Sequence, residues 1–130
     1  MPRMIFINLP VTDLDRAVSF YEALGFAKNP AFSDDTAACV VVDDNILVML
    51  LTEAKFRGFI TGDIAPRDTT EVLTCISVGS RHEVDAMREK ALAAGGSPWQ
   101  DTSGENGMYY ATFADPDGHV WEVLAMEGQG

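Results

Sequence analysis

Residues 113–123 read FADPDGHVWEV, and this stretch decides the fold. It places the turn-forming residues Asp115-Pro116-Asp117-Gly118 between two runs rich in apolar residues, 108–114 and 120–126. Proline fixes its own φ and glycine adopts a positive φ without strain, so this tetrapeptide suits a tight turn. The pattern predicts two antiparallel strands joined as a hairpin.

Upstream of this hairpin the sequence predicts a strand and then a helix. Residues 72–78 have strand character, and Ser80-Arg81-His82-Glu83 has the form of a capping box that opens a helix. We expect His82 in its first turn to be solvated. The apolar residues that mark the buried side of this helix recur at helical spacing before Gly95 and Gly96: Val84, Met87, Ala91 and Ala94.

The first half of the chain repeats this order of elements. A strand at 4–11 is followed by a second capping-box pattern, Thr12-Asp13-Leu14-Asp15, and by a helical apolar repeat that stops at Gly25. The remaining elements of this half are a short extended piece near Ala31 and two strands around an Asp-Asp-Asn turn, 36–42 and 46–51.

The repeated order predicts an α+β fold of two tandem βαβββ modules. Module one spans residues 4–51 and module two spans residues 71–126, within a single domain of 130 residues. The connecting segment, residues 52–70, is long for a connection inside a compact domain. It is a lid, a subunit contact or a linker, and these alternatives stay open at the level of sequence.

Charge and composition exclude several classes of partner. The chain has 9 Lys and Arg against 20 Asp and Glu, a formal net charge of −11. Nucleic acids and anionic membrane surfaces are bound through an excess of basic residues, so neither is an expected partner. The sequence has no apolar run of membrane-spanning length, and we expect a cytoplasmic protein. Cys39 and Cys75 lie in apolar strand-like runs, which predicts buried, reduced thiols.

Two motifs together resemble the vicinal oxygen chelate superfamily, which includes glyoxalase I, extradiol dioxygenases and bleomycin resistance proteins. They are VTDLDRAVSFYEALGF at 11–26 and FADPDGHVWEV at 113–123, joined by the repeated module. The resemblance implies that the two sheets form an open, barrel-like mixed sheet with the helices outside and a cavity inside. It also implies a homodimer, with Phe56, Phe59 and Ile60 of the connecting segment as contact or lid residues.

Metal-dependent members of the superfamily hold a divalent metal with two ligands from each module. Carried over to this sequence, the four positions are Phe6, Met49, Leu73 and Glu122. Phe and Leu have no donor atom, and a thioether is a poor ligand for hard or borderline divalent metals. A register error of one residue brings no His or Glu to these positions. We therefore expect no metal and no other cofactor.

Strand alternation extends the four positions to a predicted ligand-binding face. Glu122 is the candidate catalytic residue, because burial among apolar groups would raise its pKa and make it a general base. Tyr109 is included as one of two adjacent tyrosines, of which one faces inward. The predicted site consists of Phe6, Asn8, Met49, Leu51, Leu73, Cys75, Ser77, Tyr109 and Glu122. Its expected character is apolar with few polar groups, as is usual for a small-molecule pocket.

The leading hypothesis is metal-independent binding of a small molecule in the cavity between the modules. The acidic net charge suits a cationic ligand through long-range attraction. The first alternative is a divergent metal-dependent lyase, isomerase or dioxygenase that uses Glu122. The second is a structural or partner-binding domain in which Phe6, Met49 and Leu73 fill the cavity.

Overall fold

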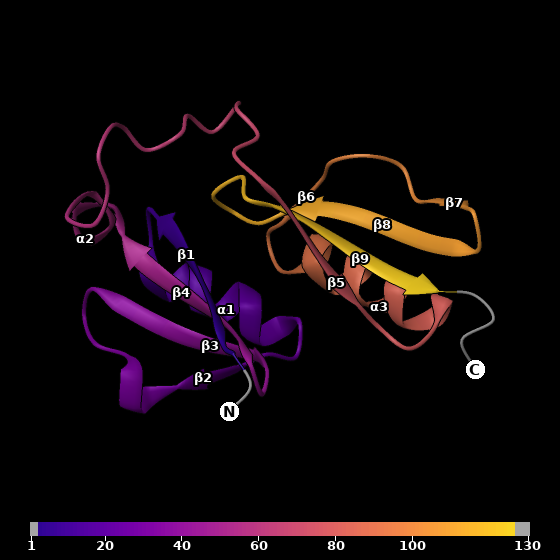
Figure 1. Ribbon diagram of the computed structural model, residues 1–130, viewed down its shortest axis with the longest axis horizontal. Helices are drawn as coiled ribbons and strands as arrows, with labels where there is room; N and C mark the ends of the chain where they lie inside the picture. The colour runs from indigo at the N-terminus through magenta and orange to yellow at the C-terminus, as the bar shows by residue number, and fades with distance from the viewer. Residues whose placement is uncertain (1–2, 127–130) are drawn as a thin grey trace. The chain divides into compact units, whose positions relative to one another are not determined.

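The computed structural model describes residues 3–126, which form two compact units that divide after Pro66 (Figure 1). The division lies inside the predicted connecting segment, so the first unit holds module one and most of that segment. No helix in the described part of the chain is long and apolar enough to cross a membrane. Each unit is described separately below.

Module one is a four-stranded sheet with one long helix on one face. The strand order is β1-β4-β3-β2, with β1 parallel to β4 and the other neighbours antiparallel. Helix α1 packs against β3 and β4, and α2 packs against β1 and β4. The elements are β1 (Ile5–Val11), α1 (Leu14–Ala23), β2 (Ala27–Asn29), the 3-10 helix η1 (Pro30–Phe32), β3 (Ala37–Asp43), β4 (Ile46–Thr52) and α2 (Glu53–Arg57).

Helix α1 begins one residue later than the capping-box pattern indicates. Asp13, and not Thr12, is the N-cap, because its Oδ1 accepts a hydrogen bond from the backbone N–H of Arg16 at 3.0 Å. Thr12 Oγ1 instead accepts from the Arg16 guanidinium at 2.8 Å. The helix stops before Gly25, whose φ of +102° strongly favours glycine. Its buried residues, Ala17, Val18, Phe20 and Tyr21, anchor it on the sheet.

Module two has the same strand order with one additional short strand, β7. Its sheet runs β5-β9-β8-β6, with β5 parallel to β9, and β7 pairs with β8. Helix α3 packs against β8 and β9, and Figure 1 shows it along one face of the sheet. The elements are β5 (Leu73–Ser77), α3 (Arg81–Ala93), β6 (Ser97–Pro98), β7 (Ser103–Glu105), β8 (Met108–Ala114) and β9 (Val120–Met126).

The second capping motif caps α3 as predicted. Ser80 is the N-cap, and its Oγ accepts from the backbone N–H of Glu83 at 3.2 Å. The Glu83 carboxylate accepts in return from the N–H of Gly79, one residue before the usual capping-box partner. Val84 and Ala91 are buried, whereas Met87 and Ala94 are half-buried. The shared α+β order of both units confirms the predicted tandem βαβββ architecture.

Two local expectations were wrong. The extended piece near Ala31 is the 3-10 helix η1, because Pro30 occupies its first turn and Asn29 Oδ1 accepts from the N–H of Ala31 at 3.0 Å. The strand expected there lies earlier, at Ala27–Asn29. Cys39 is buried as predicted, but Cys75 is exposed, and both thiols are free.

Candidate ligand-binding site

One face of the module one sheet is left without a long helix. On β1 and β4 the pairing places Phe6 opposite Leu47, and Asn8 opposite Met49. Because side chains alternate along a strand, these four lie on one face, while Leu9 and Val48 lie on the other face with α1. Phe6 is 51% exposed and Met49 is half-buried, so this face is apolar and accessible.

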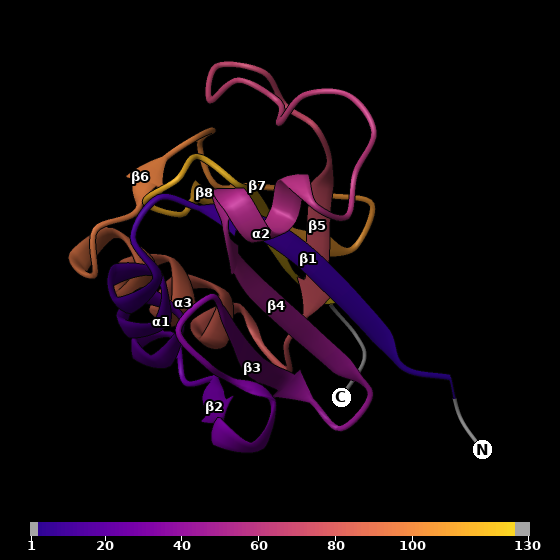
Figure 2. The ribbon, with the colours of Figure 1, turned by 90° about the vertical axis from the view of Figure 1, so that its left-hand side faces the viewer.

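A pocket of about 490 Å³ lies at the end of this face, where α2 follows β4. Figure 2 shows α2 above the ends of β1 and β4. The lining residues come from β1, β4 and the α2 region: Asn8, Leu51, Phe56, Phe59 and Ile60. Asn8 and Leu51 belong to the predicted site, and the other three to the predicted contact or lid residues. We call this set the module one pocket.

The α2 region is held in place by local hydrogen bonds. Thr52 caps α2 with its Oγ1, which accepts from the N–H of Lys55 at 3.3 Å. After the helix, the N–H of Phe59 donates to the carbonyl of Phe56 at 2.9 Å, which turns the chain back over the pocket. The connecting segment is therefore folded structure on module one over this part of its length.

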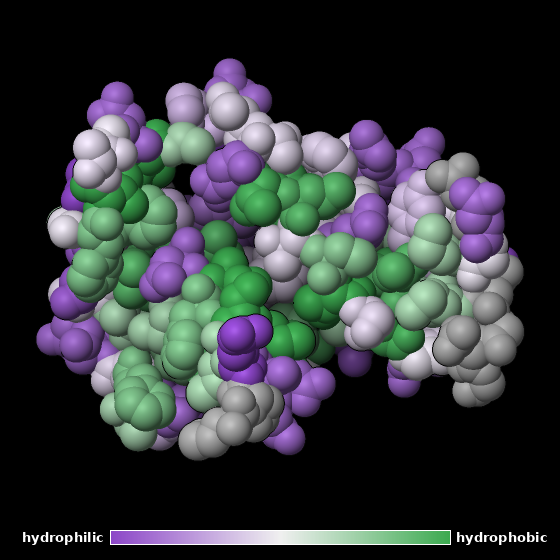
Figure 3. All heavy atoms as spheres, viewed as in Figure 1, coloured by the Kyte–Doolittle hydropathy of each residue, from purple (hydrophilic) through white to green (hydrophobic). Residues whose placement is uncertain are grey.

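Phe59 is the most exposed large apolar side chain of the described residues, at 70%. The ammonium of Lys55 lies over its ring, 5.6 Å from the centroid, so the ring presents its face to a cation. Figure 3 shows hydrophobic side chains gathered on this side of module one and at its α2 end. An exposed aromatic ring beside an apolar pocket is typical of a ligand contact.

Asn8 supplies the polar group of the module one pocket. Its side-chain amide donates to the carbonyl of Phe6 at 3.2 Å, which orients the side chain along β1. A carboxamide also has an oxygen acceptor and a second N–H. A ligand in the pocket therefore meets four apolar side chains and one group that both donates and accepts hydrogen bonds.

The open face of module two carries the remaining predicted residues. The strand register places Cys75 opposite Glu122, and Glu122 opposite Thr112. Leu73, at 44% exposure, and the exposed Ser77 lie on the same face of β5. Glu122 is half-buried. Among the predicted site residues that the structure describes, Cys75 and Glu122 are therefore two ionisable side chains that lie next to each other.

The environment of Cys75 suppresses its reactivity. Although the residue as a whole is exposed, partial desolvation of its thiol, and then the hydrogen bond and negative charge of Glu122, raise the pKa of Cys75 from 9.0 to about 11. Because the folded pKa lies above the ordinary value, the thiol stays protonated at pH 7 to 9. Since the thiolate is the nucleophile, Cys75 is not poised for covalent chemistry.

Alkylation of Cys75 by iodoacetamide at pH 8 is expected to be slow. A thiol with a pKa of about 11 is about 0.1% thiolate at that pH, against about 9% for one at 9.0. Glu122→Gln removes the charge and is expected to speed alkylation roughly three- to tenfold. Peptide mass spectrometry distinguishes Cys75 from Cys39, a fully buried internal control whose burial also raises its pKa. An unchanged rate would contradict the influence of Glu122.

Tyr109 lies on the helix side of the module two sheet, contrary to its inclusion in the predicted site. Its hydroxyl donates to Asp85 Oδ1 on α3 at 2.6 Å, which raises the pKa of Tyr109, and the Arg81 guanidinium lies 4.7 Å from its ring centroid. Tyr110 pairs with Leu124 and shares the face of Glu122. Because side chains alternate along β8, Tyr109 and Tyr110 lie on opposite faces of the sheet. The contacts of Tyr109 with α3 show that Tyr109 is on the helix side.

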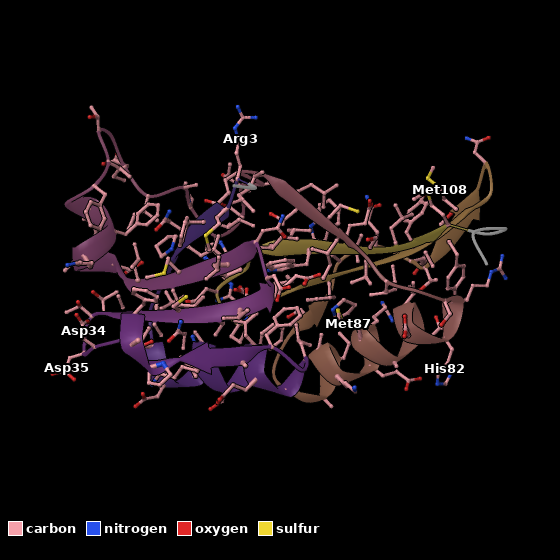
Figure 4. All side chains as sticks on the ribbon, turned by 60° about the horizontal axis from the view of Figure 1, so that its bottom comes forward. Arg3, Asp34, Asp35, His82, Met87 and Met108 are labelled. Carbon is pink, nitrogen blue, oxygen red and sulfur yellow. The ribbon has the colours of Figure 1, made fainter. Side chains whose placement is uncertain are left out.

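The two histidines lie outside the predicted faces. His82 is exposed at the start of α3, and Figure 4 shows it pointing away from the sheet. His119 Nδ1 lies 2.7 Å from Glu71 Oε1. This contact ties the chain before β5 to the β8–β9 turn. Because its two partners are 48 residues apart, no local sequence pattern indicates it.

The inherited metal positions do not fit a metal ion. Within module one they hold Phe6 and Met49, and within module two they hold Leu73 and Glu122. Carboxylate oxygen, imidazole nitrogen and thiolate sulfur are the usual ligands, and Glu122 alone supplies one of these. Residues 3–126 contain no group of three or more His, Cys, Asp or Glu side chains placed to hold a metal.

Comparisons with known proteins extend the resemblance over nearly the whole chain. Residues 3–123 match the family profile described as Glyoxalase/Bleomycin resistance protein/Dioxygenase superfamily. A search of curated proteins found no significant match. Among solved structures, a hypothetical protein from S. aureus is 29% identical with a TM-score of 0.82, covering 96% of this chain and 94% of that one.

Two further solved structures share the fold at lower identity. A glyoxalase/bleomycin resistance protein/dioxygenase family enzyme from Burkholderia phytofirmans is 15% identical with a TM-score of 0.78, covering 96% of this chain and 99% of its own. A lactoylglutathione lyase from Agrobacterium tumefaciens is 20% identical with a TM-score of 0.69, covering 94% and 92%. At these identities the likeness concerns the fold alone.

Proposed function

The chain belongs to the glyoxalase/bleomycin resistance protein/dioxygenase superfamily, and from this membership we propose that it binds a small, largely apolar molecule without a metal ion. The binding site is the module one pocket. The observation that carries the proposal is a volume of about 490 Å³ lined by Leu51, Phe56, Phe59, Ile60 and a single amide, Asn8. Pockets of 300–1,000 Å³ with apolar walls and few polar groups are usual for small ligands.

The chemistry at the inherited metal positions supports metal independence. Phe6 and Met49, on the same face as Asn8, replace the two ligands that module one provides in metal-dependent members. Their side chains add apolar surface where a metal would need donors. The ligand is therefore held by apolar contact and by hydrogen bonds to Asn8.

The overall charge of the chain favours a ligand that carries a positive group. The Lys55 ammonium already lies over the Phe59 ring, so the attraction for a cationic ligand comes from the net charge and not from this ring face. The net charge of −11 attracts such a ligand over long range, and the attraction weakens with salt. The ligand class we propose is an aromatic or aliphatic body with one cationic or hydrogen-bonding group.

Binding of a matched probe pair tests this proposal. Naphthalen-1-ylmethanol and naphthalen-1-ylmethylamine share one apolar body and differ in charge, and calorimetry measures the affinity of each. We expect both to bind, with the amine tighter at low salt. Phe56→Ala is expected to weaken both about tenfold or more, since a buried aromatic contact is removed.

Phe32→Ala is the matched control for Phe56→Ala. Phe32 is also an aromatic residue of module one, is 64% exposed and does not line the pocket. Its replacement is expected to leave both affinities unchanged. Equal losses in the two variants, or no binding of either probe, would contradict the assignment of the site.

A further inference from the structure

A second pocket, of about 250 Å³, lies within module two. Three segments meet there: the chain that leads into β5, the β6 region and the β8–β9 hairpin. The lining residues are Arg67, Asp68, Thr69, Thr70, Ser97, Pro98, Trp99, Ala114, Gly118 and Val120. We call this set the module two pocket.

Two contacts hold the leading segment against the hairpin and so shape this pocket. Glu71 Oε1 lies 2.7 Å from His119 Nδ1, just after the segment. At its other end, the Arg67 side chain crosses Gly118, where an added Cβ would come within 2.9 Å of Arg67 Cγ. Gly118 has a φ of +89°, so glycine serves both the turn and this close approach.

The lining combines opposite charges with an aromatic ring. Arg67 supplies a guanidinium that pairs with carboxylates, and the adjacent Asp68 supplies a carboxylate that pairs with ammonium groups. Trp99, 40% exposed, offers an indole face to an apolar or cationic group. Thr69, Thr70 and Ser97 add hydroxyl groups that both donate and accept.

We propose that the module two pocket binds a free α-amino acid with an apolar side chain. The carboxylate of this zwitterion pairs with Arg67, its ammonium pairs with Asp68, and its side chain packs on Trp99. A volume of about 250 Å³ equals that of about eight water molecules, which suits an amino acid of leucine size. A ligand with one charge alone pairs with only one of Arg67 and Asp68.

The fluorescence of Trp99 reports binding directly. Trp121, the second tryptophan, is 1% exposed and contributes a nearly constant background. The probes are L-leucine, 4-methylpentanoate, which lacks the amino group, and 3-methylbutylamine, which lacks the carboxylate. We expect leucine to protect Trp99 from acrylamide quenching and to bind about tenfold or more tightly than either analogue.

Two charge variants test the carboxylate contact and the ammonium contact of the ligand separately. Arg67→Gln keeps the Cγ that packs on Gly118 and is expected to weaken leucine about tenfold while sparing the amine. Asp68→Asn is expected to weaken leucine similarly while sparing 4-methylpentanoate. Phe56→Ala, in the other pocket, is expected to change none of these affinities. Leucine that binds no more tightly than the analogues, or that fails to protect Trp99, would overturn the proposal.

Discussion

Replacing Trp121 by alanine is expected to lower the free energy of unfolding of module two by about 3–5 kcal/mol. Trp121 is 1% exposed and lies on β9 between Thr74 of β5 and Phe113 of β8. Trp121 and the buried Val123 lie on the same face of the sheet, and this face packs against α3. Truncation removes the largest fully buried side chain and leaves a cavity that the sheet cannot close.

Urea unfolding followed by far-UV circular dichroism measures this loss. Trp99→Ala is the control, because the same change of side chain is made at a residue that is 40% exposed. We expect the control to lose less than about 1 kcal/mol, since little buried surface disappears. Similar losses in the two variants would show that Trp121 does not anchor the core of module two.

Replacing Asp115 by alanine is expected to cost about 2–4 kcal/mol of unfolding free energy. The Asp115 side chain is fully buried, and its Oδ1 accepts from the N–H groups of Asp117 at 2.9 Å and His119 at 2.8 Å. Alanine leaves both part-buried donors without this acceptor. The change also loosens the β8–β9 turn, which the N–H of Gly118 closes by donating to the carbonyl of Asp115 at 2.9 Å.

The module one turn provides a matched control for Asp115→Ala. Asp44 lies in the corresponding turn between β3 and β4 and is exposed. Asp44→Ala is expected to change the unfolding free energy by less than about 0.5 kcal/mol. The two variants are compared by chemical denaturation at pH 7. A cost at Asp44 equal to that at Asp115 would contradict the role assigned to the buried carboxylate.

The elements that were predicted correctly are those whose signals are local. The bounds of β8 and β9 match the prediction, because Asp115 and Gly118 define the turn by hydrogen bonding and positive φ. Ser80 caps α3 through the pattern visible in the sequence. The N-cap of α1 is Asp13 and not the predicted Thr12. The two residues are adjacent and both types cap helices, so the pattern alone does not distinguish them.

The elements that were missed depend on tertiary pairing. β6 is two residues long and includes Pro98, so it has no periodic signal and exists through its pairing with β8. β7 is likewise formed by pairing with β8 alone. The choice between Tyr109 and Tyr110 depended on the position of Asp85 on α3, which no local pattern specifies.

The candidate site was predicted in part. Asn8 and Leu51 followed from strand alternation once one position on each strand was assigned. The sequence predicted contact or lid residues in the connecting segment: Phe56, Phe59 and Ile60. Their position beside β1 and β4 depends on how α2 packs on these strands, which no local pattern specifies. The module two pocket depends on the contacts of Arg67 and Glu71 with a distant turn, which the sequence does not reveal.

Metal-independent binding in the module one pocket is tested most directly by one titration. Naphthalen-1-ylmethanol is titrated into protein dialysed against a chelator, and into the same protein supplied with Ni²⁺, Zn²⁺, Fe²⁺ or Mn²⁺. We expect the Kd values to agree within about twofold, because Phe6 and Leu73 have no donor atom and the thioether of Met49 is a poor ligand for these metals. Binding that is lost on chelation and restored by one of these metals would contradict metal-independent binding.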